Sequence, residues 1–89
     1  MSMAKTLRRK LQDAFQPVVL EIEDDSHHHA GHAGWRPGGE THFRVRLRAN
    51  AFEGVSRVAR HRLVHDVLAQ ELQGAIHALE LDLGGPHDR

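Results

Sequence analysis

The sequence contains no cysteine and no tyrosine, and it has only one tryptophan and three phenylalanines. Without cysteine the chain forms no disulfide and offers no thiolate as a nucleophile or a metal ligand. The few aromatic rings leave little on which nucleic-acid bases could stack. The serines, Ser2, Ser26 and Ser56, occupy expected cap or loop positions, and no phosphate-binding glycine loop precedes a helix, so we expect a protein that is not an enzyme.

A strong net charge and long apolar segments are also missing. Twelve basic residues balance twelve acidic ones, so bulk charge does not indicate a nucleic-acid or membrane partner. No apolar run approaches the roughly 20 residues that cross a bilayer. The basic N-terminus lacks the apolar region of a secretory signal. We therefore expect a cytoplasmic protein.

Histidine, in contrast, is abundant, with nine in 89 residues. If this chain binds a soft metal or a cluster, its own ligands must be histidines, and any thiolates must come from elsewhere. Because imidazole binds metal only when neutral, such a site is expected to be pH-sensitive. The length allows a single domain over residues 1–89, and no internal repeat is present.

Hydrophobic periodicity predicts two helices and three strands. Apolar residues spaced by four predict a helix over 3–15, which Pro17 ends. Alternation of apolar and polar residues predicts strands over 18–23, 43–48 and 78–83. Ser56 is the expected N-cap of a second helix that runs to Gly74. The apolar face of this helix is expected to carry Val58, Val64, Leu68 and Leu72.

The order helix–strand–strand–helix–strand predicts an α+β fold, with a three-stranded sheet covered on one face by helices. We expect an ordered core over about residues 3–83, a long histidine-rich loop at 24–41 and a flexible tail at 84–89. Opposite charges are expected to pair across the strands on the uncovered face. These charged residues are Glu21, Glu23, Arg44, Arg46, Arg48, Glu80 and Asp82.

The histidines differ in what their positions predict. Those between His27 and His32 form either a metal-binding element or a solvated polar loop. His77 shares the parity of the apolar positions in the last strand, so it is expected to face inward, as a partly buried residue or a ligand. His61 is expected on the apolar face of the second helix as a hydrogen-bonded core residue, and His42 to pin the end of the loop.

Several short motifs at defined spacings resemble those of the BolA family. The similarity runs from about residue 5 to residue 83. It implies a fold of the class-II-KH-like type, which agrees with the predicted order of elements. The motifs are Phe52-Glu53-Gly54, Arg60-His61-Arg62-Leu63-Val64, Ile76-His77-Ala78-Leu79 and, upstream of these, Glu40-Thr41-His42-Phe43.

The resemblance implies a partner and a cofactor. BolA-like proteins pair with monothiol glutaredoxins, and the pair holds a [2Fe–2S] cluster for which a glutaredoxin cysteine and glutathione supply thiolates. By resemblance, His77 is one ligand on this chain, and the loop ligand is His29 or, as a close alternative, His32. We expect no cofactor in the isolated chain, which should be a monomer or a weak homodimer.

Two other functions compete with this interpretation. The family resemblance also implies a DNA-binding transcriptional regulator, in which the helix with Arg57, Arg60, His61 and Arg62 would contact the DNA. A solvated helix face explains these residues better. The histidine-rich loop alone could bind zinc or nickel. Trp35 lies in the same loop and is expected either to contact a partner or to fold over the sheet.

Overall fold

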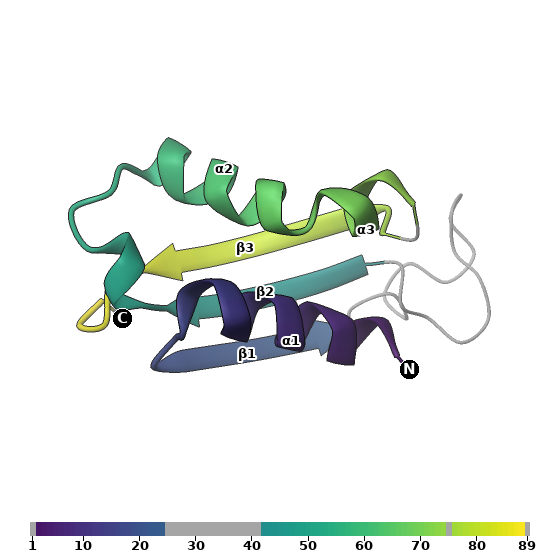
Figure 1. Cartoon of the computed structure of the whole chain (residues 1–89), viewed down its shortest axis with the longest axis horizontal. Helices are drawn as coiled ribbons and strands as arrows, with labels where there is room; N and C mark the ends of the chain where they lie inside the picture. The colour runs from purple at the N-terminus through teal and green to yellow at the C-terminus, as the bar shows by residue number, and fades with distance from the viewer. Residues whose placement is uncertain (1, 25–41, 75, 89) are drawn as a thin grey trace.

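The computed structural model describes residues 2–24, 42–74 and 76–88, which form a sheet layer and a helix layer (Figure 1). The predicted α+β order is confirmed. The elements are α1 (Met3–Phe15), β1 (Val19–Asp24), β2 (His42–Arg48), the short 3-10 helix η2 (Asn50–Phe52), α2 (Arg57–Val67), α3 (Ala69–Gln73) and β3 (Ala78–Gly84).

The first helix forms because its apolar residues share one face. Leu7 and Leu11 are fully buried, and the ring of Phe15 packs on that of Phe52 at a centroid distance of 4.9 Å. The hydroxyl of Ser2 caps the helix by accepting a hydrogen bond from the Lys5 amide at 3.2 Å. The helix ends as predicted at Phe15, before Pro17.

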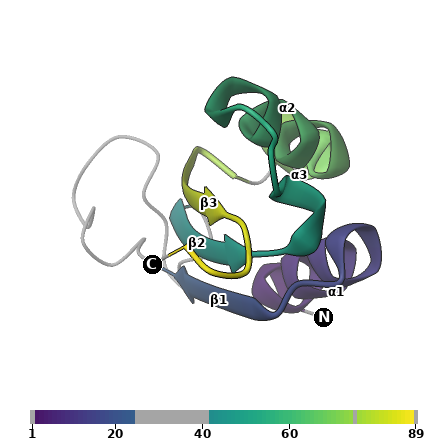
Figure 2. The ribbon, with the colours of Figure 1, turned by 90° about the vertical axis from the view of Figure 1, so that its left-hand side faces the viewer.

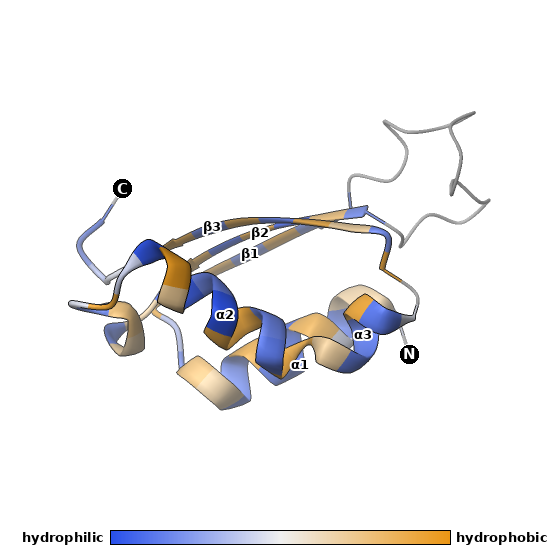
Figure 3. Ribbon diagram, turned by 90° about the horizontal axis from the view of Figure 1, so that it is seen from above, coloured by the Kyte–Doolittle hydropathy of each residue, from blue (hydrophilic) through white to orange (hydrophobic). Residues whose placement is uncertain are grey.

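The sheet has the strand order β1-β2-β3, in which β1 runs antiparallel to β2 and β2 runs parallel to β3. A parallel pair needs a long crossover, which α2 and α3 provide. The helices all lie on one face of the sheet, as the view from above shows (Figure 3). The end-on view shows α1 to one side of β1, with α2 and α3 on that same side of the sheet (Figure 2). The core therefore lies between one sheet face and the helices.

The sequence predicted one continuous second helix, but the structure has two. It breaks at Leu68, where α2 ends and α3 begins, and Leu68 itself is fully buried. Ser56 is the N-cap as predicted, accepting from the Ala59 amide at 3.2 Å. An ion pair of 2.8 Å between Lys10 and Glu71 joins α1 to α3.

Val58 was wrongly predicted to face the core, since it is 61% exposed. At about 100° per residue, six positions turn it roughly 120° around the helix from the buried Val64. Arg60, only four positions before Val64, lies on the buried side instead. The side chain of Arg60 is accordingly only 16% exposed.

The C-terminal residues differ from the flexible tail that we expected. Residues 85–88 form a turn in which the Gly85 amide donates to the Asp88 carboxylate at 2.9 Å, and the Asp88 amide donates to the Gly85 carbonyl at 3.1 Å. The turn covers Arg48, whose Nε donates to the Asp88 carbonyl oxygen at 3.2 Å. Arg48 is thereby buried, with 2% exposure, although it was predicted on the solvated face.

Candidate functional site

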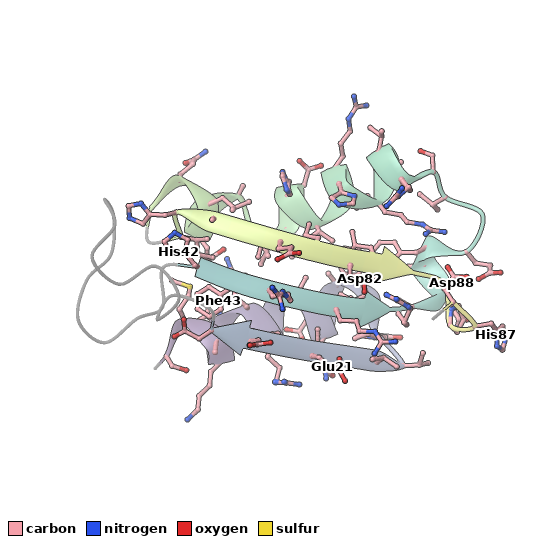
Figure 4. All side chains as sticks on the ribbon, turned by 180° about the vertical axis from the view of Figure 1, so that it is seen from behind. Glu21, His42, Phe43, Asp82, His87 and Asp88 are labelled. Atoms are coloured by element: carbon pink, nitrogen blue, oxygen red, sulfur yellow. The ribbon has the colours of Figure 1, made fainter. Side chains whose placement is uncertain are left out.

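Two histidines meet at one end of the sheet. His42 is the first residue of β2 and pairs with Ala78 of β3, so His77, directly before Ala78, lies beside it. The centroids of the two imidazole rings are 6.1 Å apart, with an angle of 21° between the ring planes. Figure 4 shows His42 at the start of β2, at the opposite end of the sheet from His87. The sheet register thus brings together two imidazoles that are distant in sequence.

His77 does not face inward, and this prediction was wrong. The residue is exposed and lies in a bend just before β3, whereas its neighbour Ile76 is buried. The alternation that turns Leu79, Leu81 and Leu83 inward holds only within β3. It does not determine the orientation of His77, which precedes the strand. The exposed position leaves the imidazole accessible to an external group.

The segment that carries the predicted loop ligands joins the sheet at this same end. Asp24, the last residue of β1, pairs with Phe43, and His42 opens β2. Residues 25–41 therefore leave and rejoin the sheet beside the two histidines. The candidate residues His29, His32 and Trp35 lie outside the described residues, so their predicted roles stay predictions.

The described part of the chain does not supply a complete metal site of its own. Within residues 2–24, 42–74 and 76–88, no group of three or more His, Cys, Asp or Glu side chains is placed to hold a metal ion. A metal or cluster at His77 would therefore need ligands from residues 25–41, from a partner or from solvent.

A second candidate surface lies on the exposed side of α2. A shallow depression there is lined by Arg57, Val58, His61, Arg62 and His65. His61 is only partly buried, contrary to its predicted core position, and its Nδ1 is 2.9 Å from the Arg57 carbonyl oxygen. His61 precedes Val64 by three positions, which places it about 60° around the helix from that buried residue, at the edge of the buried side of α2.

Arg60 does not belong to this basic surface, which corrects the grouping predicted from sequence. Its Nε donates to the Phe52 carbonyl oxygen at 3.1 Å, and its terminal nitrogen donates to the Leu83 carbonyl oxygen at 3.4 Å. The same nitrogen is 3.9 Å from the Asp88 carboxylate. Arg60 therefore ties α2 to η2 and to the end of β3, while Arg57 and Arg62 remain exposed.

The uncovered face of the sheet carries the cross-strand charge pairs that the sequence predicts. Arg44 contacts Glu80 at 3.1 Å, and Arg46 lies 3.6 Å from Glu21. These exposed pairs lie along a shallow depression over the sheet. Their opposite charges offset one another, so this face has no dominant sign.

No helix within the described ranges is long and apolar enough to cross a bilayer.

The three-stranded mixed sheet, covered on one face by helices, makes this an α+β domain of the BolA type. The chain belongs to the BolA family: the family model described as BolA-like protein matches residues 11–88. The fold that the sequence predicted is thus confirmed.

Known proteins resemble the chain over most of its length. It is 49% identical over 80 residues to BolA-like protein 1 of Homo sapiens, covering 90% of this chain and 56% of that protein. It is 46% identical over 84 residues to SufE-like protein 1, chloroplastic/mitochondrial, of Arabidopsis thaliana, covering 90% of this chain and 23% of that protein. The solved BolA domain of SufE1 from Arabidopsis thaliana superposes with a TM-score of 0.85 and 44% identity, covering 97% of this chain and 94% of that one.

Proposed function

We propose that this chain is a partner of a monothiol glutaredoxin and shares a [2Fe–2S] cluster with it. The observation that carries the proposal is the exposed His77, next to the point where residues 25–41 join the sheet, in a chain without cysteine. An accessible imidazole can ligate iron only if other ligands reach the same point, and the adjoining segment and a partner can provide them. The role is non-catalytic: cluster trafficking, assembly or iron sensing.

The proposed ligand set divides between the two proteins. His77, directly before β3, is one ligand on this chain, and His29, or alternatively His32, is the second. A glutaredoxin cysteine and glutathione supply the thiolates. Because imidazole carries no negative charge, replacing two thiolates by imidazoles raises the reduction potential, as in Rieske centres. It also favours loss of the cluster in acid, where free imidazole becomes protonated.

The comparisons support an iron–sulfur role at a coarser level. A BolA domain similar to this chain occurs within SufE-like protein 1, and the chain spans about half the length of human BolA-like protein 1. The cytoplasm remains the expected compartment. The proposed partner and cluster rest on the family resemblance together with the position of His77.

The test is anaerobic co-expression with a monothiol glutaredoxin, followed by absorption and circular dichroism spectroscopy of the purified pair. We expect a coloured heterodimer with charge-transfer bands of mixed histidine and cysteine ligation. His77→Ala should remove these bands, because it removes one ligand of the cluster. His87→Ala is the matched control, since His87 is also exposed but lies at the other end of the sheet. Bands of unchanged position and intensity in His77→Ala would exclude the proposed ligand.

A DNA-binding role has one observation in its favour, the exposed pair Arg57 and Arg62 along α2. If these side chains contact phosphates, DNA affinity falls steeply with salt, and each substitution by alanine lowers the slope by about one. We expect instead weak binding with a shallow salt slope, because Arg60 is not on the surface and the net charge is zero. Fluorescence anisotropy on a duplex, at several salt concentrations, distinguishes the two. Arg60→Ala is unsuitable here because it disturbs the fold.

A further inference from the structure

We propose that His61 and His65 form a binding site for one divalent cation of borderline softness, such as Zn²⁺, on the outer side of α2. The two histidines are four positions apart in this helix, and both line the shallow depression on its exposed side. The site uses none of the proposed cluster ligands and requires no partner protein, so it goes beyond the proposed function.

The helix places the two imidazoles on the same face. Residues four positions apart are rotated by about 40° around an α-helix, and their Cβ atoms are about 5–6 Å apart. The Cα–Cβ bond of His65 tilts toward the helix N-terminus and therefore toward the turn that carries His61. Two helical histidines at this spacing can bind one zinc ion through metal–nitrogen bonds of about 2.0–2.1 Å. The spacing therefore suits a shared ion without any movement of the backbone.

A hydrogen bond determines which nitrogen of His61 is available to a metal. Its Nδ1 lies 2.9 Å from the Arg57 carbonyl oxygen. Since a carbonyl oxygen can only accept, Nδ1 carries the proton, and Nε2 of the neutral ring keeps a free lone pair. Histidines that bind metals typically donate their other N–H to a carbonyl oxygen or a carboxylate, which fixes the tautomer and the ring orientation. His61 already has this arrangement before any ion binds.

The backbone between the two histidines is held by the core. Val64, which lies between them in sequence, is fully buried, and the Ser56 hydroxyl caps the start of α2. His61 is partly buried and His65 is exposed, so an ion can reach the pair from solvent. Only the two side chains lose conformational freedom when an ion binds, because the helix is already formed.

The donors and the surrounding charges define the class of ion and the strength of binding. Imidazole nitrogen suits Zn²⁺, Ni²⁺ and Cu²⁺, whereas Mg²⁺ and Ca²⁺ require oxygen ligands. Since no group of three or more suitable side chains exists in the described ranges, water fills the remaining coordination positions. Arg57 and Arg62 line the same depression, and their solvent-screened charges weaken the attraction for a cation without excluding it. We therefore expect exchangeable binding.

The experiment is a zinc titration of the full chain, followed by long-range proton–nitrogen NMR correlation, which reports each imidazole nitrogen separately. Because the histidine-rich loop could capture zinc first, the reference protein carries asparagine at the loop histidines, and every variant is made in this background. Circular dichroism verifies that each protein is folded. The replaced residues are His27, His28, His29 and His32.

We expect the signals of His61 and His65 to shift together when Zn²⁺ is added, and to stay unchanged with Mg²⁺. In His61 the larger change should be at Nε2, because Nδ1 is engaged with the Arg57 carbonyl oxygen. His65→Asn should weaken zinc binding at His61 by about tenfold or more, since the second imidazole no longer binds the ion within the same molecule.

A variant with a displaced histidine controls for the number of histidines. It combines His65→Asn with Asp66→His, so that the two imidazoles are five positions and about 140° apart around the helix. Both substituted positions are exposed, so the helix is expected to fold normally. This variant has as many histidines as the reference protein, but it should bind zinc as weakly as His65→Asn alone.

Three results would overturn the proposal. The first is a reference protein in which neither imidazole signal shifts with zinc, and the second is a shift of only one of the two. The third is a variant with the displaced histidine that binds zinc as tightly as the reference protein. Since no glutaredoxin is present, a negative outcome leaves the proposed cluster untouched, and a failed cluster experiment leaves this site untouched.

Discussion

At the scale of single residues, Arg48 is the side chain whose environment departs most from its type. Arg48 is charged but only 2% exposed, and hydrogen-bond acceptors surround its guanidinium. Its nitrogens donate to the carbonyl oxygens of Leu47, Asp82 and Asp88 and to the Asp82 carboxylate, at 2.9–3.2 Å. A buried cation is tolerated only when it is paired and hydrogen-bonded in this way.

Removing this guanidinium should destabilise the fold. We expect Arg48→Ala to lower the free energy of unfolding by about 2–3 kcal/mol, since it leaves buried carbonyl oxygens without donors and creates a cavity. Arg44→Ala, which breaks the exposed pair with Glu80, should cost less than about 1 kcal/mol. Urea unfolding followed by circular dichroism measures both. Equal losses for the two variants would contradict the structural role assigned to Arg48.

The placement of individual side chains was the least predictable part of the molecule. The helical angle between Arg60 and Val64 already indicates that Arg60 is on the buried side, but hydropathy alone assigns an arginine to the surface. The exposure of His77 depends on where β3 begins, and a difference of one residue reverses the face. The His42–His77 pair could be found only from the parallel register, which the sequence does not specify.

At the scale of elements, the end of α1 contains a conformation that its residue disfavours. Gln16, the C-cap, has φ 47° in the left-handed region, and its amide donates to the Gln12 carbonyl oxygen at 2.9 Å. For residues with a Cβ this conformation costs roughly 1–2 kcal/mol, whereas glycine adopts it without strain. The chain uses it to turn from α1 towards β1.

Glycine at this position should therefore stabilise the protein. We expect Gln16→Gly to raise the free energy of unfolding by about 0.5–1 kcal/mol, after allowing for the extra freedom that glycine gives the unfolded chain. Gln12→Gly, in the body of the same helix, should instead lower it by about 1 kcal/mol. Thermal unfolding compares the two. A loss of stability in Gln16→Gly would mean that the glutamine side chain makes a contribution larger than the strain.

The elements themselves were largely predictable. The helix over 3–15 and the N-cap Ser56 follow directly from apolar spacing and capping chemistry. The break at Leu68 was not predicted, because Leu68 and Leu72 continue the apolar spacing through it. Helix packing against β3 and the ion pair between Lys10 and Glu71 are tertiary effects that no local pattern contains.

At the scale of the whole molecule, the two ends of the sheet are unlike each other. At one end the turn formed by residues 85–88 covers Arg48, and Arg60 hydrogen-bonds to both η2 and β3. At the other end His42 and His77 lie beside the end of β1 at Asp24. The proposed ligand His77 therefore lies at the opposite end of the sheet from the C-terminal turn.

Because the loop ligands lie outside the folded sheet core, their substitution is expected to affect cluster binding more than partner binding. We expect His29→Ala or His32→Ala to loosen the cluster in the complex with glutaredoxin, while the cluster-free heterodimer keeps its affinity within about twofold. The reason is that the substitution removes a ligand without changing the folded sheet. Cluster content by absorption and affinity by calorimetry are the two measurements. An equal loss of cluster-free binding would show that the segment contributes to the protein interface itself.

The parallel pairing of β2 with β3 also has a consequence for the order of events during synthesis. His42 and His77 are separated along the chain by the whole of α2 and α3, and they meet only when the last strand joins the sheet. Closing so long a connection is a late step in folding. A nascent chain that still lacks β3 therefore cannot bring the two imidazoles together.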